Sequence, residues 1–403
     1  MNFDFINTDA YKSFLSQYEG VDTKMLRLKN LSKYDFDTDF AITQIECRRK
    51  AKNKIPDLAD LLLYPTDISI EQCTSDIVAK FHASLFSKDD VIVDFTCGLG
   101  VDSFYISKGV NRLYCCDINP VVAEVAQYNF SKLGADNATA TCCSAEELAE
   151  NLPANATACF IDPSRRDSKD VQTRFYSLAD CVPDLRLIVK CISAKVNYII
   201  VKASPMIDIT QTVKEFAGIT DVWVISVKND CKELLFKIDF KTKSDAASVI
   251  HALNFDSSGI EQFDCQYGKY EEVSYGAPME GCCLFVPNAS VMKSGYTSNL
   301  SNSFGLNKIA PNTNLFVGGC DGRRGFPGKI YRVEKIFSMS KQDLKLIKIA
   351  YPKANIACRN FPLSPEQLRK KLKVKDGGDI YLFAATTQDD KHILMVCTKS
   401  IID

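Results

Sequence analysis

The chain has 403 residues, of which 46% are hydrophobic and 25% charged, the usual composition of a globular protein with two or three domains. Its N-terminal segment lacks the basic start and apolar core of a secretion signal. No apolar run approaches the ~20 residues that a membrane-spanning helix needs. We therefore expect neither a membrane span nor a membrane partner.

The formal net charge of −1 conceals an uneven distribution. Residues 341–375 contain ten Lys or Arg and two acids, so this segment carries +8 and the rest of the chain −9. A shorter basic run, CRRKAKNK, covers residues 47–54. The two runs together suit a phosphate backbone, whereas either one alone is equally typical of a solvated helix face.

The seventeen cysteines do not form a metal-binding pattern. No CxxC pair occurs, and three pairs are directly adjacent: Cys115/Cys116, Cys142/Cys143 and Cys282/Cys283. Many cysteines lie in apolar runs, where a thiol acts as a small core residue. We expect no metal site, mostly free thiols and a reducing, cytoplasmic location.

The first 75 residues predict helices. Apolar residues recur at three-and-four spacing over residues 23–31 and 38–63, and Pro56 and Pro65 interrupt the pattern. Residues 69–86 predict one further amphipathic helix, with Ser69 as N-cap and Gln72 completing a capping box.

From Val91 onward, short apolar strands alternate with helical stretches. Five strands are expected over residues 91–95, 112–118, 138–144, 158–163 and 197–204. This spacing suits βαβ units and therefore a parallel sheet buried on both faces. Residues 221–240 form two strands around a brief polar turn, which must pair antiparallel.

Beyond Lys241, strands, Gly and Ser become frequent, and residues 318–329 are expected to form a loop or linker. A second compact segment follows, with a strand at 332–340, helices at 340–352 and 364–374, and a final hairpin of residues 380–387 and 392–399.

The glycine turn after the first strand, DFTCGLG, is placed where open α/β sheets bind ligands. Gly98 and Gly100 allow close approach of the backbone, and Asp117 at the tip of the second strand suits the two hydroxyls of a ribose. A dinucleotide fingerprint would need a third glycine where Ser103 stands. Asp94, which suits the ammonium group of a methionine, and the antiparallel hairpin both favour S-adenosylmethionine instead.

The combination of DFTCGLG, DIN and DPSRR resembles class I S-adenosylmethionine-dependent methyltransferases. The run IEQCTSDIVAKFHASLFSKDDVIVDFTCGLGVDSFYISKG resembles the trimethylguanosine-synthase-like branch. Nearly the whole chain, including QIECRRKAKNKIP and IACRNFPLSPEQLRKKLKVKDGGDIYLF, is similar to bacterial methyltransferases with a C-terminal THUMP-like domain. The resemblance implies a Rossmann-like α/β sheet of seven strands with an antiparallel hairpin, a helical N-terminal region and a small α+β C-terminal domain.

We accordingly expect four domains. They are a helical N-terminal domain at 1–75, the methyltransferase domain at 76–242, a ferredoxin-like α+β linking domain at 243–328, and a basic THUMP-like domain at 329–403.

The resemblance also implies the roles of residues in the cofactor site. Asp94, Thr96, Gly98 and Gly100 would surround the methionine part, and Asp117 and Ile118 would contact the ribose and one face of the adenine. The turn that contains Ser144, Ala145 and Glu146 would reach the adenine amine, with Glu146 in place of an aspartate that this family usually has at Ser144. The segment from Gln72 to Ser75, including Thr74, would cover the methionine end.

At the end of the fourth strand, Asp162, Pro163, Ser164 and Arg165 are the candidate catalytic residues. Amino-group methyltransferases have an acid or amide, two prolines and an aromatic residue here, and only the acid and the first proline match. Arg165 and Arg166 suit stacking on a base or binding a phosphate, or else form ion pairs in a solvated turn. Ser204 stands where a covalent carbon-methylating enzyme would have a cysteine, so that route is not expected.

The candidate substrate-binding residues are Arg166, Lys202, Ser204, Lys370 and Lys371. Because THUMP domains bind tRNA, the resemblance implies a base of tRNA or rRNA as the methylated group. The sequence leaves open a small-molecule or protein substrate, a non-catalytic RNA-binding subunit and, more distantly, an NAD-dependent oxidoreductase. It does not indicate the methylated atom or the oligomeric state.

Overall fold

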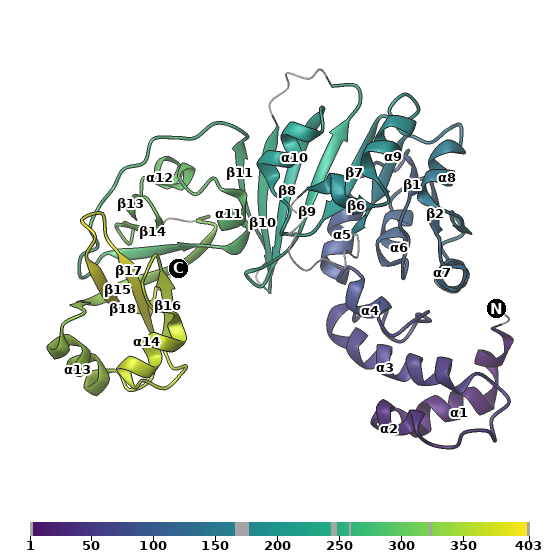
Figure 1. The fold of residues 1–403 in the computed structure, drawn as a ribbon, viewed down its shortest axis with the longest axis horizontal. Helices are drawn as coiled ribbons and strands as arrows, with labels where there is room; N and C mark the ends of the chain where they lie inside the picture. Colours follow the sequence, from purple (N-terminus) through teal and green to yellow (C-terminus); the bar gives the residue numbers. More distant parts are fainter. Residues whose placement is uncertain (1–2, 166–176, 243–247, 258, 322–324, 401–403) are drawn as a thin grey trace. The chain divides into compact units, whose positions relative to one another are not determined.

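The computed structural model describes residues 3–165, 177–242, 248–257, 259–321 and 325–400 (Figure 1). The predicted substrate residue Arg166 therefore lies outside the described residues. Within those ranges, no helix is long and apolar enough to cross a membrane.

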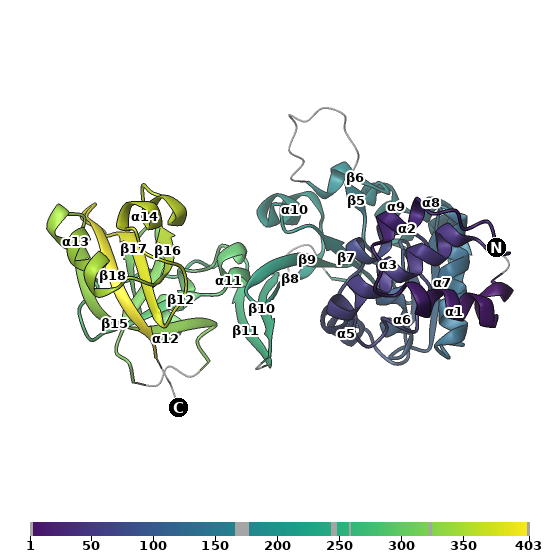
Figure 2. The same ribbon diagram turned by 90° about the horizontal axis from the view of Figure 1, so that it is seen from below.

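The chain forms two compact units, and the finer division into four domains stays a prediction (Figures 1 and 2). The first unit contains Met1–Thr220 and Phe236–Ala246, and the second contains Asp221–Leu235 and Ala247–Asp403. The chain thus enters the second unit, returns to the first and leaves it again. The N-terminal helices and the parallel strands belong to one unit because a common core joins them.

That common core is largely aromatic. Tyr11, Phe14 and Phe40 are buried together with Val125, which lies on the first helix after the second strand of the sheet. Side chains of the preceding residue cap each of the three N-terminal helices, because Ser, Thr, Asp and Asn accept hydrogen bonds from free helical amides. The elements and caps are η1 (Asp4–Asn7), α1 (Asp9–Tyr18; Thr8), α2 (Thr23–Arg27; Asp22) and α3 (Thr38–Lys54; Asp37).

The helix predicted over residues 69–86 is wrong as one element. It is divided into α4 (Ser69–Gln72) and α5 (Asp76–Ser84), with extended backbone at Cys73 and Ser75. The capping box is also wrong, since Ile68 is the N-cap of α4 and the Ser69 hydroxyl bonds to that of Thr66. The break turns the Thr74 hydroxyl toward Asp102 and Lys202 of the sheet core, and these hydrogen bonds replace the helical ones.

The five predicted parallel strands are confirmed, and the antiparallel hairpin follows them. The sheet has the order β11-β10-β8-β9-β7-β4-β1-β2-β3, so the seven expected strands are extended by two at one edge. Strand β10 pairs in parallel with β8, which sequence alternation alone does not reveal. The strands are β1 (Val91–Asp94), β2 (Arg112–Asp117), β3 (Ala138–Cys142), β4 (Ala158–Ile161), β7 (Tyr198–Ala203), β8 (Ile219–Val227), β9 (Asp230–Asp239), β10 (Val249–Asp256) and β11 (Gly259–Gln266).

Helices cover both faces of the parallel strands, as expected for a sheet without a solvated face (Figure 1). The hairpin turn between β8 and β9 consists of Lys228 and Asn229, which both have positive φ, as the two central residues of a tight hairpin require. The helices of this part are α6 (Val101–Ser107), α7 (Pro120–Lys132), α8 (Ala145–Glu150), α9 (Leu185–Ile192) and α10 (Ile209–Glu215), with the short turn η2 (Leu178–Asp180).

The second unit also contains a mixed seven-stranded sheet of order β13-β14-β12-β15-β18-β17-β16. The predicted final hairpin is confirmed as the antiparallel pair β17–β18, and the helix predicted at 364–374 begins with a true capping box between Ser364 and Gln367. The elements are β12 (Cys283–Pro287), α11 (Ala289–Ser294), α12 (Asn299–Phe304), β13 (Asn307–Ala310), β14 (Thr313–Gly318), β15 (Gly328–Ser338), α13 (Lys341–Ala350), β16 (Asn355–Arg359), α14 (Pro365–Leu372), β17 (Ile380–Thr386) and β18 (His392–Lys399).

Fifteen cysteines have free thiols, and several of them, including Cys115, Cys116 and Cys159, are buried as predicted. Cys283 and Cys320 form a disulfide, which the sequence did not predict. The bond follows from strand register: Cys283 of β12 pairs with Gly318 of β14, and Cys320 lies just beyond it.

Candidate active site

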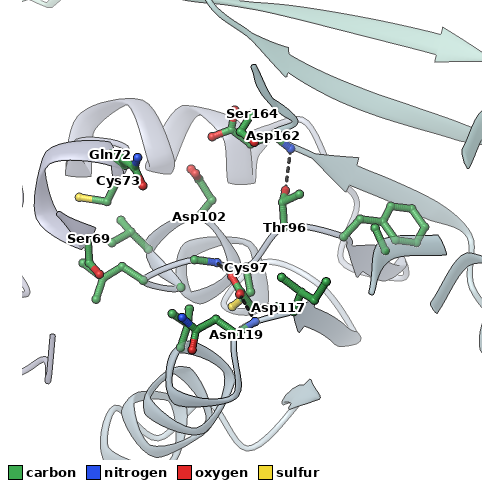
Figure 3. A pocket seen from close by; sticks show the side chains of 18 of the residues that line it. Ser69, Gln72, Cys73, Thr96, Cys97, Asp102, Asp117, Asn119, Asp162 and Ser164 are labelled. Atoms are coloured by element: carbon green, nitrogen blue, oxygen red, sulfur yellow. Dashed lines mark hydrogen bonds between the residues drawn. The ribbon is translucent and has the colours of Figure 1, made fainter. Parts of the chain in front are cut away.

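A cavity of about 670 Å³ opens at the carboxyl ends of β1, β2 and β4 (Figure 3). Its walls come from the glycine turn, the start of α8, the α4–α5 break and the short antiparallel pair β5 (Ser164–Arg165) and β6 (Cys181–Val182). The predicted site residues that line it are Thr74, Thr96, Gly98, Gly100, Asp117, Ile118, Ser144, Ala145, Glu146, Asp162, Ser164 and Lys202.

Other predicted residues lie elsewhere. Asp94, Pro163 and Ser204 do not line the cavity, and Lys370 and Lys371 belong to the second unit. The Ser204 hydroxyl accepts a hydrogen bond from the amide of Met206 and so stabilises the turn in which Ser204 itself lies. For Arg165, only the backbone in β5 is described.

The glycine turn combines open space with left-handed backbone. Gly98 and Gly100 have φ of 53° and 83°, a region that favours glycine. A Cβ on Gly98 would meet nothing within 4 Å, whereas one on Gly100 would lie 3.2 Å from the ring of Phe130. Gly98 thus leaves room for a ligand, and Gly100 leaves room for helix packing.

Asp94 is placed differently from its predicted role. It is only 1% exposed, and its two carboxylate oxygens accept hydrogen bonds from the Thr96 amide and the Ser103 hydroxyl. Burial raises the pKa of Asp94 to about 7. Asp94 therefore holds the glycine turn from beneath. At the position where a dinucleotide site has its third glycine, Ser103 supplies one of these hydrogen bonds.

Asp117 is fixed at the opposite end of the cavity. One carboxylate oxygen accepts from the Gly98 amide at 3.2 Å and the other from the Asn119 amide at 2.9 Å. Beside it, the Ile118 side chain is 77% exposed and has an apolar face free for a flat ring. The Ser144 hydroxyl accepts from the Glu147 amide and caps α8. These features fit the ribose and adenine of a nucleoside.

A charged cluster lies at the other end of the cavity, and Figure 3 shows its two aspartates, Asp102 and Asp162, among the lining residues. The Lys202 ammonium lies 2.7 Å from Asp162 and 3.8 Å from Asp102, and it donates to the Thr74 hydroxyl at 2.8 Å. The Asp162 amide in turn donates to the Thr96 hydroxyl at 2.7 Å. Lys202 therefore joins the glycine-turn helix, the fourth strand and the α4–α5 break.

Asp102 is a site residue that sequence reasoning missed. Its carboxylate lies 2.8 Å from the ring of the fully buried His82 and accepts a hydrogen bond from Thr74. Burial favours its neutral form, but the charges of Lys202 and His82 outweigh burial and hold the pKa of Asp102 below its usual range. An acid in the first turn of a helix carries no distinctive sequence signal, because such acids are common at helix N-termini.

Ser164 and Val182 bring a second chain segment to the cavity. Ser164 pairs with Val182 across β5–β6, and its hydroxyl donates to the Val182 carbonyl. Val182 and Pro183 consequently line the cavity beside Asp162. Among the described residues, no group of three or more His, Cys, Asp or Glu could hold a metal ion.

Comparison with known proteins agrees with this geometry. Residues 328–399 match the THUMP domain-like family, and residues 284–320 match a ferredoxin-like domain family. The chain is 24% identical to two uncharacterized S-adenosylmethionine-dependent methyltransferases of Mycobacterium tuberculosis, strains CDC 1551 / Oshkosh and ATCC 25618 / H37Rv, over 81% of this chain and 87% of each relative. A crystal structure from Porphyromonas gingivalis W83, assigned as a methyltransferase, covers 99% of this chain and 100% of its own, with a TM-score of 0.86 and 25% identity.

The fold and the cavity, together with these similarities, define an S-adenosylmethionine-dependent methyltransferase. S-adenosylmethionine is its cofactor, and the open space at Gly98 and the exposed face of Ile118 fit that molecule. More narrowly, the chain is similar over nearly its whole length to a methyltransferase of known structure, and its C-terminal residues 328–399 match the THUMP domain-like family.

Proposed function

We propose that this methyltransferase acts on a base of structured RNA, either tRNA or rRNA. The observation that carries the proposal is a set of exposed lysines within the THUMP-like segment, residues 328–399. They have no ion-pair partner among the described residues, so their charge is available to phosphates. They are Lys341, Lys345, Lys348, Lys353, Lys370, Lys371, Lys373 and Lys375.

At the active site, S-adenosylmethionine supplies an electrophilic methyl group when bound. Our proposal assigns Asp162 to accept a hydrogen bond from the amine of the target base and to orient its lone pair along the line of displacement. Lys202 holds that carboxylate in place through the 2.7 Å contact. Ser164, which also lines the cavity, would form part of the wall against which the base lies.

Loss of one methylated nucleoside would test the substrate. Nucleosides from tRNA and rRNA of a deletion strain are compared with wild type by mass spectrometry, and the strain is complemented with wild-type protein or with Asp162→Asn. We expect one methylated nucleoside to disappear on deletion and to return only with the wild-type gene. A complete set of methylated nucleosides in the deletion strain would contradict an RNA substrate and favour a small molecule or protein.

A second arm tests the lysines directly. We expect Lys370→Ala/Lys371→Ala to lower the affinity for total tRNA or rRNA while leaving S-adenosylhomocysteine binding unchanged. Lys88→Ala/Lys241→Ala, which removes two exposed lysines outside the basic segment, is the matched control. Equal RNA affinity of the two double variants would exclude Lys370 and Lys371 from the RNA interface.

We also infer that the protein acts in the cytoplasm, where its RNA substrate would be found. Fifteen free thiols in the described part of the chain support a reducing compartment. Fractionation of cells that produce the tagged protein tests the location, and recovery outside the cytoplasmic fraction would contradict it.

A further inference from the structure

A second cavity, of about 840 Å³, lies within the first unit among the N-terminal helices and α7. It shares no lining residue with the active site. Neither the methyltransferase chemistry nor the THUMP-like domain accounts for it. Its principal lining residues are Tyr11, Lys12 and Leu15 of α1, Arg48, Arg49 and Lys52 of α3, Leu61 of the following loop, and Tyr128 and Lys132 of α7.

The lining is strongly positive. Five basic side chains face two acids, Glu19 and Asp60. Glu19 is already paired with Lys52 at 3.1 Å, and Arg49 is committed to the backbone carbonyls of Glu19 and Val21. Lys12, Arg48 and Lys132 remain without an ion-pair partner in the ranges that the structure describes, so the cavity has an unbalanced positive charge that favours an anion.

Two buried polar groups in this lining have no hydrogen-bond partner among the described residues. They are the hydroxyl of Tyr11, a residue only 1% exposed, and the Nε–H of Arg48. An unmade hydrogen bond of a buried group costs about 1–3 kcal/mol, so such groups are rare without a ligand or water to satisfy them. Both are donors here, because burial raises the pKa of Tyr11 and keeps it protonated.

The cavity also has an apolar side. Leu15 and Tyr128 line it, and Leu61 is 55% exposed there. A bare inorganic anion would leave this surface in contact with water, whereas a ligand with a flat ring and an anionic group would cover it and satisfy both donors. A nucleotide has both parts.

We propose that this cavity binds a nucleotide, whose phosphate accepts hydrogen bonds from Tyr11 and Arg48 and whose base packs against Tyr128 and Leu61. The nucleotide is either free or part of an RNA strand. The inference goes beyond the proposed function, since binding of this chemistry does not require RNA to be the methylated molecule.

Calorimetry with nucleoside 5′-monophosphates tests the proposal. Saturating S-adenosylhomocysteine is present throughout, so that the active site is filled. We expect Arg48→Gln to weaken nucleotide binding at least tenfold, because the variant loses the ion pair with the phosphate as well as a hydrogen bond. We expect Tyr11→Phe to weaken it about fivefold, because that variant loses only one hydroxyl hydrogen bond to the phosphate. Tyr11→Phe removes an unsatisfied hydroxyl, so its melting temperature should equal or exceed that of wild type. The combination of weaker binding with undiminished stability would not arise from a merely structural tyrosine.

Tyr18→Phe, on the same helix but outside the cavity lining, is the matched control and should bind like wild type. A single-stranded oligoribonucleotide forms the second arm: tighter binding than the monophosphates assigns the site to RNA, and equal binding assigns it to free nucleotides. Affinity that is unchanged in both Arg48→Gln and Tyr11→Phe, or inorganic phosphate that binds as tightly as a nucleotide, would overturn the proposal. Methyl transfer to RNA, measured in parallel, separates its failure from failure of the proposed function.

Discussion

At the scale of single residues, one ammonium group organises the end of the candidate active site that contains Asp162. Lys202 contacts Asp162, Asp102 and Thr74, which come from three separate elements. Lys202 is only 8% exposed, and these contacts compensate for the solvation that its side chain loses on burial. The position of Asp162 therefore depends on a residue far from it in sequence.

Asp162→Asn should lower kcat/KM about 100-fold, because an amide of the same shape accepts hydrogen bonds less strongly and loses its ion pair with Lys202. S-adenosylhomocysteine affinity, measured by calorimetry, should stay within about threefold of wild type, since Asp117 lies at the other end of the cavity. Asp89→Asn, an exposed aspartate outside the site, is the control. Activity above half of wild type in Asp162→Asn would remove Asp162 from the catalytic assignment.

His251 provides a pH-dependent contribution to stability in the second unit. Its two ring nitrogens lie 3.1 Å from Asp221 and 2.9 Å from Asp264, and Trp223 stacks on the ring. Burial lowers the pKa of His251, but hydrogen bonds to the two carboxylates outweigh burial and raise it above 6.5. Because the pKa of His251 is higher in the folded than in the unfolded state, protonated His251 contributes fully to the free energy of unfolding below pH 6.5. This contribution is lost as the pH rises through the pKa that His251 has in the folded state.

We therefore expect His251→Gln to lower the free energy of unfolding by about 2 kcal/mol at pH 5.5 and by less at pH 9. Urea unfolding of wild type and variant at both pH values checks this. His392→Gln, which alters a histidine without a carboxylate partner in the described residues, should show no comparable difference. A destabilisation by His251→Gln that grows with pH would contradict the assigned sign.

Individual site residues were predictable where a residue type has a fixed place at a strand end. Thr96, Asp117 and Asp162 line the cavity for that reason. Asp102 was not predictable, because only the tertiary fold brings the first turn of α6 beside Lys202. Asp94 follows the expected motif, yet both of its carboxylate oxygens accept hydrogen bonds from within the glycine turn. The sequence does not distinguish a carboxylate that lies beneath a loop from one that faces the ligand.

At the scale of elements, the two glycines of the turn have different roles: Gly98 leaves space for a ligand, and Gly100 leaves space for the ring of Phe130. Gly98→Ala and Gly100→Ala both place a side chain at positive φ, which costs about 1–2 kcal/mol. Only at Gly100 does the new Cβ also press on a neighbour, the ring of Phe130 at 3.2 Å. Gly100→Ala should therefore reduce the melting temperature more than Gly98→Ala, whereas Gly98→Ala, whose Cβ enters open space, should weaken S-adenosylhomocysteine binding. Equal losses of stability would contradict the packing role of Gly100.

Strands were easier to predict than helix ends. The five parallel strands are short apolar runs bounded by polar residues, and this local pattern determines them. The break at Cys73–Ser75 has no local cause, since the amphipathic pattern continues across it. Tertiary hydrogen bonds from Thr74 compensate for the lost helical bonds. Likewise, β10 and β11 alternate as ordinary strands, and nothing local assigns them to the large sheet.

At the scale of the whole molecule, positive charge is concentrated in residues 341–375. Each phosphate contact steepens the salt dependence of single-strand binding by about 0.7 in a plot of log affinity against log salt, and of duplex binding by about 0.9. Lys370→Ala/Lys371→Ala should therefore reduce the slope for RNA by about 1.4–1.8, measured by titration between 50 and 200 mM salt. Lys88→Ala/Lys241→Ala should leave it unchanged, and an identical slope in the first variant would show that these lysines contact no phosphate.

The concentration of positive charge could be predicted from the sequence, because counting charged residues along the chain requires no knowledge of the fold. The disulfide between Cys283 and Cys320 was not visible, since it depends on the register of two strands. The division into two compact units could not be predicted from the sequence either, because it depends on the return of the chain to the first unit after Leu235.

That return has a consequence for synthesis. The ribosome releases the chain from its N-terminus, and domains generally fold as they emerge. Here the catalytic half lacks Phe236–Ala246 until a stretch that belongs to its neighbour, Asp221–Leu235, has already left the tunnel. A nascent chain arrested near residue 220 would therefore hold an unfinished enzyme, and a gene fragment ending there would encode one.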